Sequence, residues 1–323
     1  MLAAEIHGSD FLSAGDKALI VSIFVVPLVV AFVVGLVIGS LCNVVIYRLV
    51  HYRSIWSPPS HCPRCRNEIP WYDNIPILSW IFLRGRCRFC KGPISLRYPV
   101  VELISGLLYA GIMYRFLYAP YLPADELGQL RLHFDITDIT TILFLFKCYI
   151  FATFILILAA IDIEHMLLPN RLTVSGAVIG VLLSPFILPG RAEVFPNSRL
   201  TLFNVPPPLD GILQSVLGLV AGGGVIFIFF VIGYLIYRRV VMGIGDLKLA
   251  GMIGAFVGLS QIGPALFVGF VVGGIMGVLF WLFRLAGLKS FIPLGPYLCI
   301  GGFVGLLWGP NLMHMYLNYL HLP

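Results

Sequence analysis

The sequence predicts an all-α protein that crosses a membrane several times, and three observations support this fold class. Of the 323 residues, 59% are hydrophobic and only 11% are charged. A soluble protein of this length would carry about a quarter of its residues as charge. Apolar runs of about 20 residues recur along the chain, as a hydrocarbon layer roughly 30 Å thick requires. The length and continuity of these runs exclude a transmembrane β-barrel, whose strands are short and alternating.

Eight transmembrane helices are expected from the apolar runs. The first run, 18–47, is too long for the hydrophobic region of a signal peptide, and no basic segment precedes it. The sixth expected helix is short and rich in glycine, so we expect it to be tilted or broken. The expected helices cover residues 18–46, 98–119, 139–161, 172–189, 210–237, 247–260, 263–284 and 292–309.

The basic residues predict the orientation of these helices. Nine of the 21 Lys and Arg lie between Arg48 and Arg97. Under the positive-inside rule this segment is expected to be a cytoplasmic loop rather than a surface for nucleic acid, and no nucleic-acid partner is expected. An even number of helices then places both termini on the outer side.

The cytoplasmic loop contains two cysteine pairs, Cys62-x-x-Cys65 and Cys87-x-x-Cys90, separated by 21 residues. Four thiolates from two tight turns can complete the tetrahedral shell of a structural zinc ion. The alternatives are two disulfides or four unrelated thiols. Disulfides are disfavoured because the cytoplasm is reducing. The basic neighbours that would offset the negative charge of the metal site are Arg64, Arg66, Arg86, Arg88 and Lys91.

A closed four-cysteine site has no open coordination position for a substrate or water. We therefore expect its metal to stabilise the fold of a small domain rather than to take part in catalysis. Trp71, Tyr72 and Trp80 are expected to form the core of this domain or to lie at an interface. Gly85 is expected to serve the turn before the second cysteine pair. The cysteines outside the loop, expected to be ordinary buried thiols, are Cys42, Cys148 and Cys299.

Two aspartates are the candidate catalytic residues. Asp162 follows an apolar helix and precedes Leu168-Pro169-Asn170, and Asp246 follows Gly243 and Gly245 in a GxGD sequence. Both are expected at the cytoplasmic border on different helices, so they can converge. When two carboxyl groups are held close, one keeps a proton and the other acts as a base. Such a pair can activate water and protonate a peptide carbonyl.

The two glycines of the GxGD sequence, Gly243 and Gly245, are expected to give substrate access, because glycine has no side chain and lets an extended backbone approach closely. A GxGD sequence alone is weak evidence, and a single aspartate at a helix border is more often a helix cap than a catalyst. The combination of GxGD, a second aspartate before Leu-Pro-Asn and the shared side of the membrane favours a catalytic pair.

In its ordered motifs the chain resembles the bifunctional type IV prepilin peptidases. The resemblance includes GSLCNVVIYRL at 39–49, the double CxxC with WYDNIPILSW between its pairs, and GPISLRYPVVELISG at 92–106. It continues through Asp162 with its Leu-Pro-Asn, the GxGD sequence that ends at Asp246, and IPLGPYLCIGG at 292–302. The chain departs from the expected pattern at Leu41-Cys42, where a phenylalanine-leucine type pair is typical.

The resemblance implies a GxGD-type intramembrane aspartyl peptidase of the bacterial inner membrane. Such an enzyme removes the basic leader of type IV prepilins and of type II secretion pseudopilins after a glycine, and methylates the new amino terminus with S-adenosylmethionine. The resemblance assigns catalysis to Asp162 and Asp246. It assigns the metal to Cys62, Cys65, Cys87 and Cys90. Candidates for attracting the basic leader are Glu68, Asp73, Glu102 and Glu164. No residues are assigned to the methyl donor.

This interpretation divides the chain into four parts. Residues 1–47 form the outer amino terminus and the first helix, 48–97 the cytoplasmic zinc-binding domain, 98–138 the second helix and an outer loop, and 139–323 a six-helix aspartyl peptidase domain. A transporter or channel would also carry intramembrane acids, but at the midplane and without need of a four-cysteine domain. A non-catalytic platform for pilus assembly would need neither aspartate.

Overall fold

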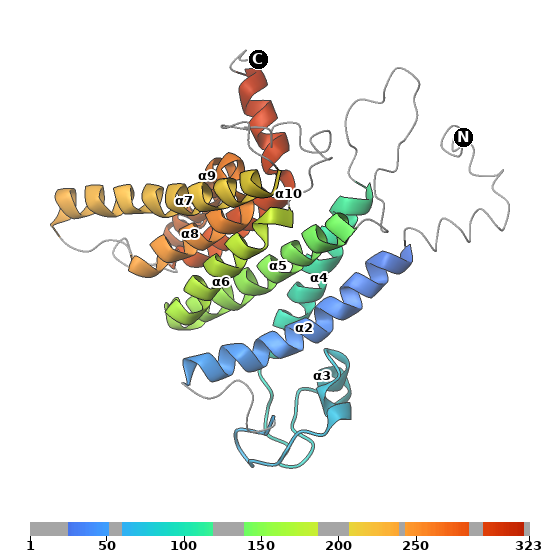
Figure 1. The fold of residues 1–323 in the computed structure, drawn as a ribbon. Helices are drawn as coiled ribbons and strands as arrows, with labels where there is room; N and C mark the ends of the chain where they lie inside the picture. Colours follow the sequence, from blue (N-terminus) through green and yellow to red (C-terminus); the bar gives the residue numbers. More distant parts are fainter. Residues whose placement is uncertain are drawn as a thin grey trace, which may run out of the picture. The chain divides into compact units, whose positions relative to one another are not determined.

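The computed structural model describes residues 25–51, 60–118, 139–186, 207–238, 243–283 and 293–319, and within these ranges the protein is helical without β-strands (Figure 1). The chain forms two compact units that divide between Thr141 and Ile142. The helices are α2 (Val26–Val50), α3 (Leu78–Phe82), α4 (Arg97–Tyr118), α5 (Ile139–His165), α6 (Asn170–Leu182), α7 (Pro207–Tyr237), α8 (Ile244–Val257), α9 (Leu259–Leu282) and α10 (Gly295–Tyr319), with 3-10 turns η2 (Trp71–Asn74) and η3 (Ser184–Phe186).

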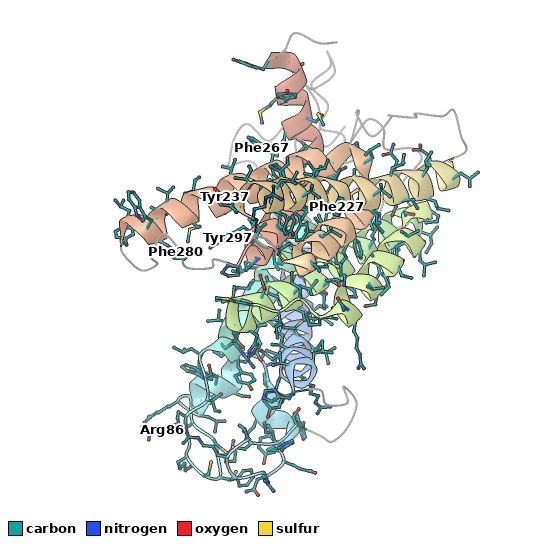
Figure 2. The ribbon with its side chains drawn as sticks, turned by 90° about the vertical axis from the view of Figure 1, so that its left-hand side faces the viewer. Arg86, Phe227, Tyr237, Phe267, Phe280 and Tyr297 are labelled. Carbon is teal, nitrogen blue, oxygen red and sulfur yellow. The ribbon has the colours of Figure 1, made fainter. Side chains whose placement is uncertain are left out.

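The structure confirms an all-helical protein with several apolar helices. Among the described residues, four helices are long and apolar enough to cross a membrane: Val26–Val50, Ile142–His165, Leu209–Tyr237 and Leu259–Leu282. Each of the eight expected ranges overlaps one observed helix, but the number of eight membrane crossings stays a prediction. Large side chains such as Phe227, Tyr237 and Phe267 stand outward and exposed (Figure 2), which is typical of a surface that faces lipid.

In the first unit, α2 and α4 pack closely in antiparallel directions through small residues. A Cβ added to Gly35 would lie 2.7 Å from the Ser105 carbonyl oxygen, and one added to Gly39 would lie 2.7 Å from Glu102 Cα. Farther along α2, Asn43 Nδ2 donates to the Tyr98 carbonyl oxygen at 3.0 Å. Small residues let membrane helices approach this closely. These contacts fix the register between the two helices.

The segment between α2 and α4 folds as a small module around short turns. Asp73 in η2 accepts two hydrogen bonds from Arg88, at 2.7 Å from Nε and 2.5 Å from Nη2. Gly85 has a positive φ of 65° and lies against the Trp80 ring, so it serves the turn before the second cysteine pair as expected. Trp71 is 81% exposed and therefore is not part of a core.

In the second unit, α8 is the central helix. Its residues 249–257 are all buried, and it packs on α6, α7 and α10. A Cβ on Gly218 of α7 would lie 2.7 Å from the Gly258 carbonyl carbon, and one on Gly222 would lie 3.0 Å from that of Ala250. The helix is continuous from Ile244 to Val257 and is not broken. It ends at Gly258, whose φ of 82° suits glycine, and α9 starts at the next residue.

Candidate active site and metal centre

Asp162 lies in the last turn of α5 and is only 5% exposed. The backbone N–H of Met166, which has a positive φ of 50°, donates to the Asp162 carbonyl oxygen at 2.9 Å and ends the helix. The side-chain atom Oδ2 is buried and has no hydrogen-bond partner among the described residues. The helix end is therefore completed by backbone, and the carboxyl group is left to interact with something else.

Asp246 lies in the first turn of α8, where an acidic side chain is favoured by the helix dipole. The N-cap residue is Gly243, and no side chain caps this helix. The backbone N–H of Asp246 donates to the Gly243 carbonyl oxygen at 3.2 Å. Neither aspartate acts as a helix N-cap, which was the structural alternative for an isolated acid.

The structure brings the two aspartate motifs together within the second unit. The Asp162 carboxyl group is close enough to Asp246 for its negative charge to act on the Asp246 carboxyl group. A Cβ on Gly245 would lie 2.9 Å from Leu168 Cβ, so the GxGD turn packs directly on the Leu-Pro-Asn segment. Lys248 Nζ donates to Asn170 Oδ1 at 2.7 Å and links the same two segments. These contacts hold the end of α5 beside the start of α8.

A third helix, α10, contributes two residues to this site that the sequence analysis did not assign. Gly295 begins α10, and a Cβ added there would lie 3.0 Å from Asp162 Cγ and would overlap Oδ2. Cys299, one turn later on the same face, is buried and interacts with the charges of both Asp162 and Asp246. Both residues lie in the IPLGPYLCIGG motif at 292–302, whose proline suits the first turn of a helix, but the motif did not indicate contact with the aspartates.

The acids proposed to attract a basic leader have different surroundings. Glu102 is buried, and its Oε2 accepts the Ile77 backbone N–H at 2.7 Å. The Asp73 side chain is almost fully enclosed by its pairing with Arg88, which holds the pKa of Asp73 below its usual value. Glu68 and Glu164 are exposed. The structure therefore leaves two of the four acids on the surface.

The four loop cysteines form one cluster that could hold a metal ion. Their sulfur atoms all lie within 4.8 Å of one another, and Cys62 Sγ and Cys90 Sγ are 3.9 Å apart. No pair forms a disulfide. Tetrahedral zinc with Zn–S bonds of about 2.3 Å would separate its sulfurs by roughly 3.8 Å. The donor set and its spacing fit a four-thiolate metal site.

The two cysteine pairs are presented by equivalent turns. The N–H of Arg66 donates to the Cys62 carbonyl oxygen at 2.8 Å, and the N–H of Lys91 donates to that of Cys87 at 3.0 Å. Arg66 and Lys91 both have positive φ, of 60° and 55°. This local repeat was not recognised in the sequence, although in both turns a basic residue directly follows the second cysteine and an isoleucine, Ile69 or Ile94, lies three residues later.

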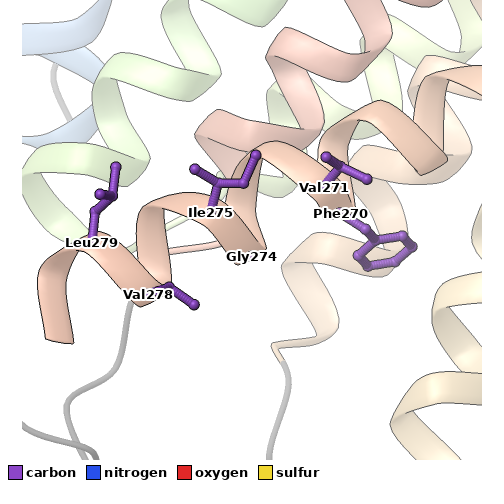
Figure 3. Close-up of a pocket in the computed structure, with 6 residues that line it drawn as sticks. All are labelled: Phe270, Val271, Gly274, Ile275, Val278 and Leu279. Carbon is purple, nitrogen blue, oxygen red and sulfur yellow. The ribbon is translucent and has the colours of Figure 1, made fainter. Parts of the chain in front are cut away.

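An open apolar groove of about 420 Å³ lies along one side of α9 (Figure 3). The residues that line it are Phe270, Val271, Gly274, Ile275, Val278 and Leu279. It offers no acid, nucleophile or hydrogen-bonding side chain. It is therefore a hydrophobic surface of the helix and not a candidate active site.

The chain matches two family profiles in the order that the motifs suggest. Residues 33–116 match the bacterial peptidase A24 N-terminal domain, and residues 149–278 match the type IV leader peptidase family. The second match includes both Asp162 and Asp246, and the first includes all four loop cysteines.

Curated relatives named prepilin leader peptidase/N-methyltransferase match most of the chain. The protein of Aeromonas hydrophila is 32% identical over 90% of this chain and 93% of its own length. That of Stutzerimonas stutzeri is 30% identical over 90% of this chain and 94% of its own length. The protein of Legionella pneumophila is 30% identical over 88% of this chain and 92% of its own length. No solved structure matches. The chain belongs to the type IV leader peptidase family.

Proposed function

We propose that this protein is a membrane-embedded aspartyl endopeptidase that removes the leader of type IV prepilins and then methylates the new amino terminus. The observation that carries the proposal is the convergence of Asp162, at the end of α5, with Asp246, at the start of α8. The family and the names of the relatives support both activities. Type II secretion pseudopilins are proposed as further substrates, and S-adenosylmethionine as the methyl donor.

The proposed cleavage uses the two carboxyl groups as base and acid. The ionised member of the pair takes a proton from a water molecule, and the oxygen of that water attacks the scissile carbonyl carbon. The protonated member gives its proton to the carbonyl oxygen. The resulting diol collapses, the C–N bond breaks, and the amine leaves with a proton from the pair. The proposed contact of this water is Oδ2 of Asp162, which has no hydrogen-bond partner among the described residues.

Gly243 is the proposed point of close approach for the substrate backbone. It is exposed, and the nearest atom to an added Cβ would be Asp246 Oδ2, at 3.4 Å. Gly245 contributes to access in another way, because the absence of its side chain lets the turn pack on Leu168. The substrate would lie with its basic leader in the cytoplasm and its apolar helix in the bilayer. The proposed contacts of the leader are exposed Glu68 and Glu164, the second of which also lies 3.6 Å from His165 Nε2.

We further propose a structural zinc ion on Cys62, Cys65, Cys87 and Cys90. A bound ion would tie the two equivalent turns to each other, because each turn supplies two of the four sulfurs. The proposed organisation is an outer terminus and first helix at 1–47, a cytoplasmic zinc domain at 48–97, a second helix and outer loop at 98–138, and a six-helix peptidase domain at 139–323. The proposed location is the inner membrane, with eight crossings and both termini outside.

Cleavage by the purified protein in liposomes tests the proposal. The substrate is a peptide with a basic leader, a glycine and an apolar segment, and mass spectrometry identifies the product. The protein and an Asp210→Asn control, which changes a partly buried acid in the first turn of α7, should both cut after the glycine. Asp162→Asn should not. An Asp162→Asn protein that is correctly inserted and still releases the leader would refute the mechanism, and a labelled methyl donor reports methylation separately.

A further inference from the structure

The cysteine module exposes a cluster of large apolar side chains on α3 and η2. Phe82 is 80% exposed and Trp71 81%, and Leu78 and Ile81 are each more than half exposed. We call these four residues the α3 surface. In a small domain this much apolar surface marks a place of contact rather than chance exposure. No described residue of the module covers it.

Hydrogen bonds on the inward side of α3 hold the α3 surface in place. Ser79 is buried; its hydroxyl accepts the Ile75 backbone N–H and donates to the Tyr72 carbonyl oxygen, both at 3.0 Å. Trp80 Nε1 donates to the Ile94 carbonyl oxygen at 3.2 Å, just before α4 begins. The two inward residues, Ser79 and Trp80, therefore make the side-chain hydrogen bonds of this five-residue helix. The outward residues are left entirely apolar.

One hydrogen bond sets the position of α3 relative to the membrane helices. The Ile77 backbone N–H donates to Glu102 Oε2 at 2.7 Å. Glu102 lies about 7.5 Å into α4, five residues after Arg97 at a rise of 1.5 Å each. Its Cα faces Gly39 of α2, which lies 11 residues before the end of that helix at Val50. The start of α3 thus lies beside the pair of helices α2 and α4 rather than beyond its ends, as Figure 1 shows for α3 and α2.

The backbone at this attachment is strained. Ile77 has φ 59° and ψ −51°, and the Leu78 N–H donates back to the Pro76 carbonyl oxygen at 2.5 Å, which makes a rare γ-turn. Positive φ is costly for a β-branched residue. Such strain persists where the surroundings enforce it. The buried Glu102 carboxyl group enforces it here, and so fixes the depth of the helix that follows.

We propose that the α3 surface inserts into the interfacial layer of the bilayer. Tryptophan and phenylalanine beside aliphatic residues are typical of a short helix that lies in this layer. Arg84, exposed directly after α3, would meet the anionic headgroups of the cytoplasmic leaflet. The module then has two attachments to the membrane. One is its covalent link to α2 and α4, and the other is the α3 surface in the lipid. Together they keep the cysteine cluster at a constant distance from the bilayer. This inference is independent of the aspartates.

A photocrosslinking experiment tests the contact in the full chain. Benzoylphenylalanine replaces Phe82, the protein is placed in liposomes of phosphatidylethanolamine and phosphatidylglycerol, and adducts are identified by mass spectrometry after illumination. The matched control carries the probe in place of Phe89, which is 52% exposed but lies in the second cysteine turn. Lipid adducts should be several-fold more abundant at position 82 than at position 89. Equal adducts at both positions, or adducts at 82 only with another protein copy, would overturn the proposal.

A second measurement tests the attachment. Glu102→Ala removes the acceptor of the Ile77 N–H, and should reduce lipid adducts at position 82 while the metal content stays unchanged. If this variant loses its metal, the double variant Ile81→Asn, Phe82→Asn decides the question, because it alters only exposed side chains. It should retain the metal and show faster amide hydrogen exchange across 71–82 in liposomes. Exchange at the parent rate would mean that no lipid covers this surface.

Discussion

Replacing Gly295 by alanine tests whether α10 positions the Asp162 carboxyl group. An alanine Cβ would lie 3.0 Å from Asp162 Cγ and 3.5 Å from its Cβ, with Oδ2 nearer still. Ordinary van der Waals contact begins at 3.4 Å, so the new methyl group and the present carboxyl position exclude each other. We expect the carboxyl group to move and α10 to stay.

The packing of α10 supports this expectation and sets the magnitude. Farther along the helix, a Cβ on Gly301 would lie 2.8 Å from Gly269 Cα, and one on Gly305 would lie 3.0 Å from Ala265 Cα, so α10 is pressed against α9. The Asp162 side chain can therefore move more easily than helix α10. A displacement of about 1 Å at a reacting group costs about 100-fold in rate. That loss corresponds to about 2.7 kcal/mol in the activation barrier.

The assay is leader cleavage by the purified protein, with kcat and KM measured separately. Gly295→Ala should lower kcat about 100-fold and change KM little, because the substituted residue contacts a catalytic group rather than the bulk of the substrate. Gly274→Ala is the matched control, since an added Cβ at this position in α9 meets nothing within 4 Å. A correctly inserted Gly295→Ala protein with the kcat of the Gly274→Ala control would refute the positioning role.

Asp162→Asn and Asp246→Asn should each lower the rate of leader release by about 10⁴-fold or more, and the double variant should be no slower, because the pair acts as one unit. A further loss in the double variant would contradict a dyad. Cys62→Ser should release the metal and unfold the module, because metal binding and folding share one free energy. Metal analysis and proteolysis of the purified variant check this, and a folded variant with full metal would disprove the site. Asp73→Asn should speed amide hydrogen exchange in η2 at neutral pH. Arg88 lowers the pKa of Asp73, so the stabilisation is present above the ordinary carboxyl pKa and disappears as pH falls through the lowered one. A difference between parent and variant that persists below that pH would argue against the ion pair as its source.

The helices could be predicted because a lipid-facing helix must be apolar along its whole length, whatever its neighbours are. Their ends could not be predicted as well. Helix α5 was expected to end at residue 161 but continues to His165, so that Asp162 lies within the helix rather than after it. Hydropathy reports where the chain meets lipid, whereas the helix end depends on the positive φ of Met166. The cysteine cluster was predictable because its ligands are close in sequence and identical in chemistry.

Contacts between residues that are far apart in the chain could not be predicted from the sequence. Gly295 reaches Asp162 only because α10 packs next to α5, and nothing in a Gly-Pro pair indicates that neighbour. Likewise, the sequence offered Glu102 and Asp73 as candidates for attracting a basic leader, beside the alternative that each is a structural acid. The structure gives these acids partners 25 and 15 residues away, which depend on the turns of the module. Pairing of this kind is decided by backbone geometry, and not by composition.

The shortness of α8 has a consequence for how water reaches a bond inside a membrane protein. Its 14 residues make a helix about 21 Å long, which is less than the roughly 30 Å depth of hydrocarbon. Because α8 packs on α6, α7 and α10, a helix shorter than the hydrocarbon depth is flanked here by protein rather than by lipid. Asp246 lies in the first turn of this helix. We therefore expect the aqueous phase to reach the Asp246 carboxyl group at the start of α8 without a channel that crosses the bilayer.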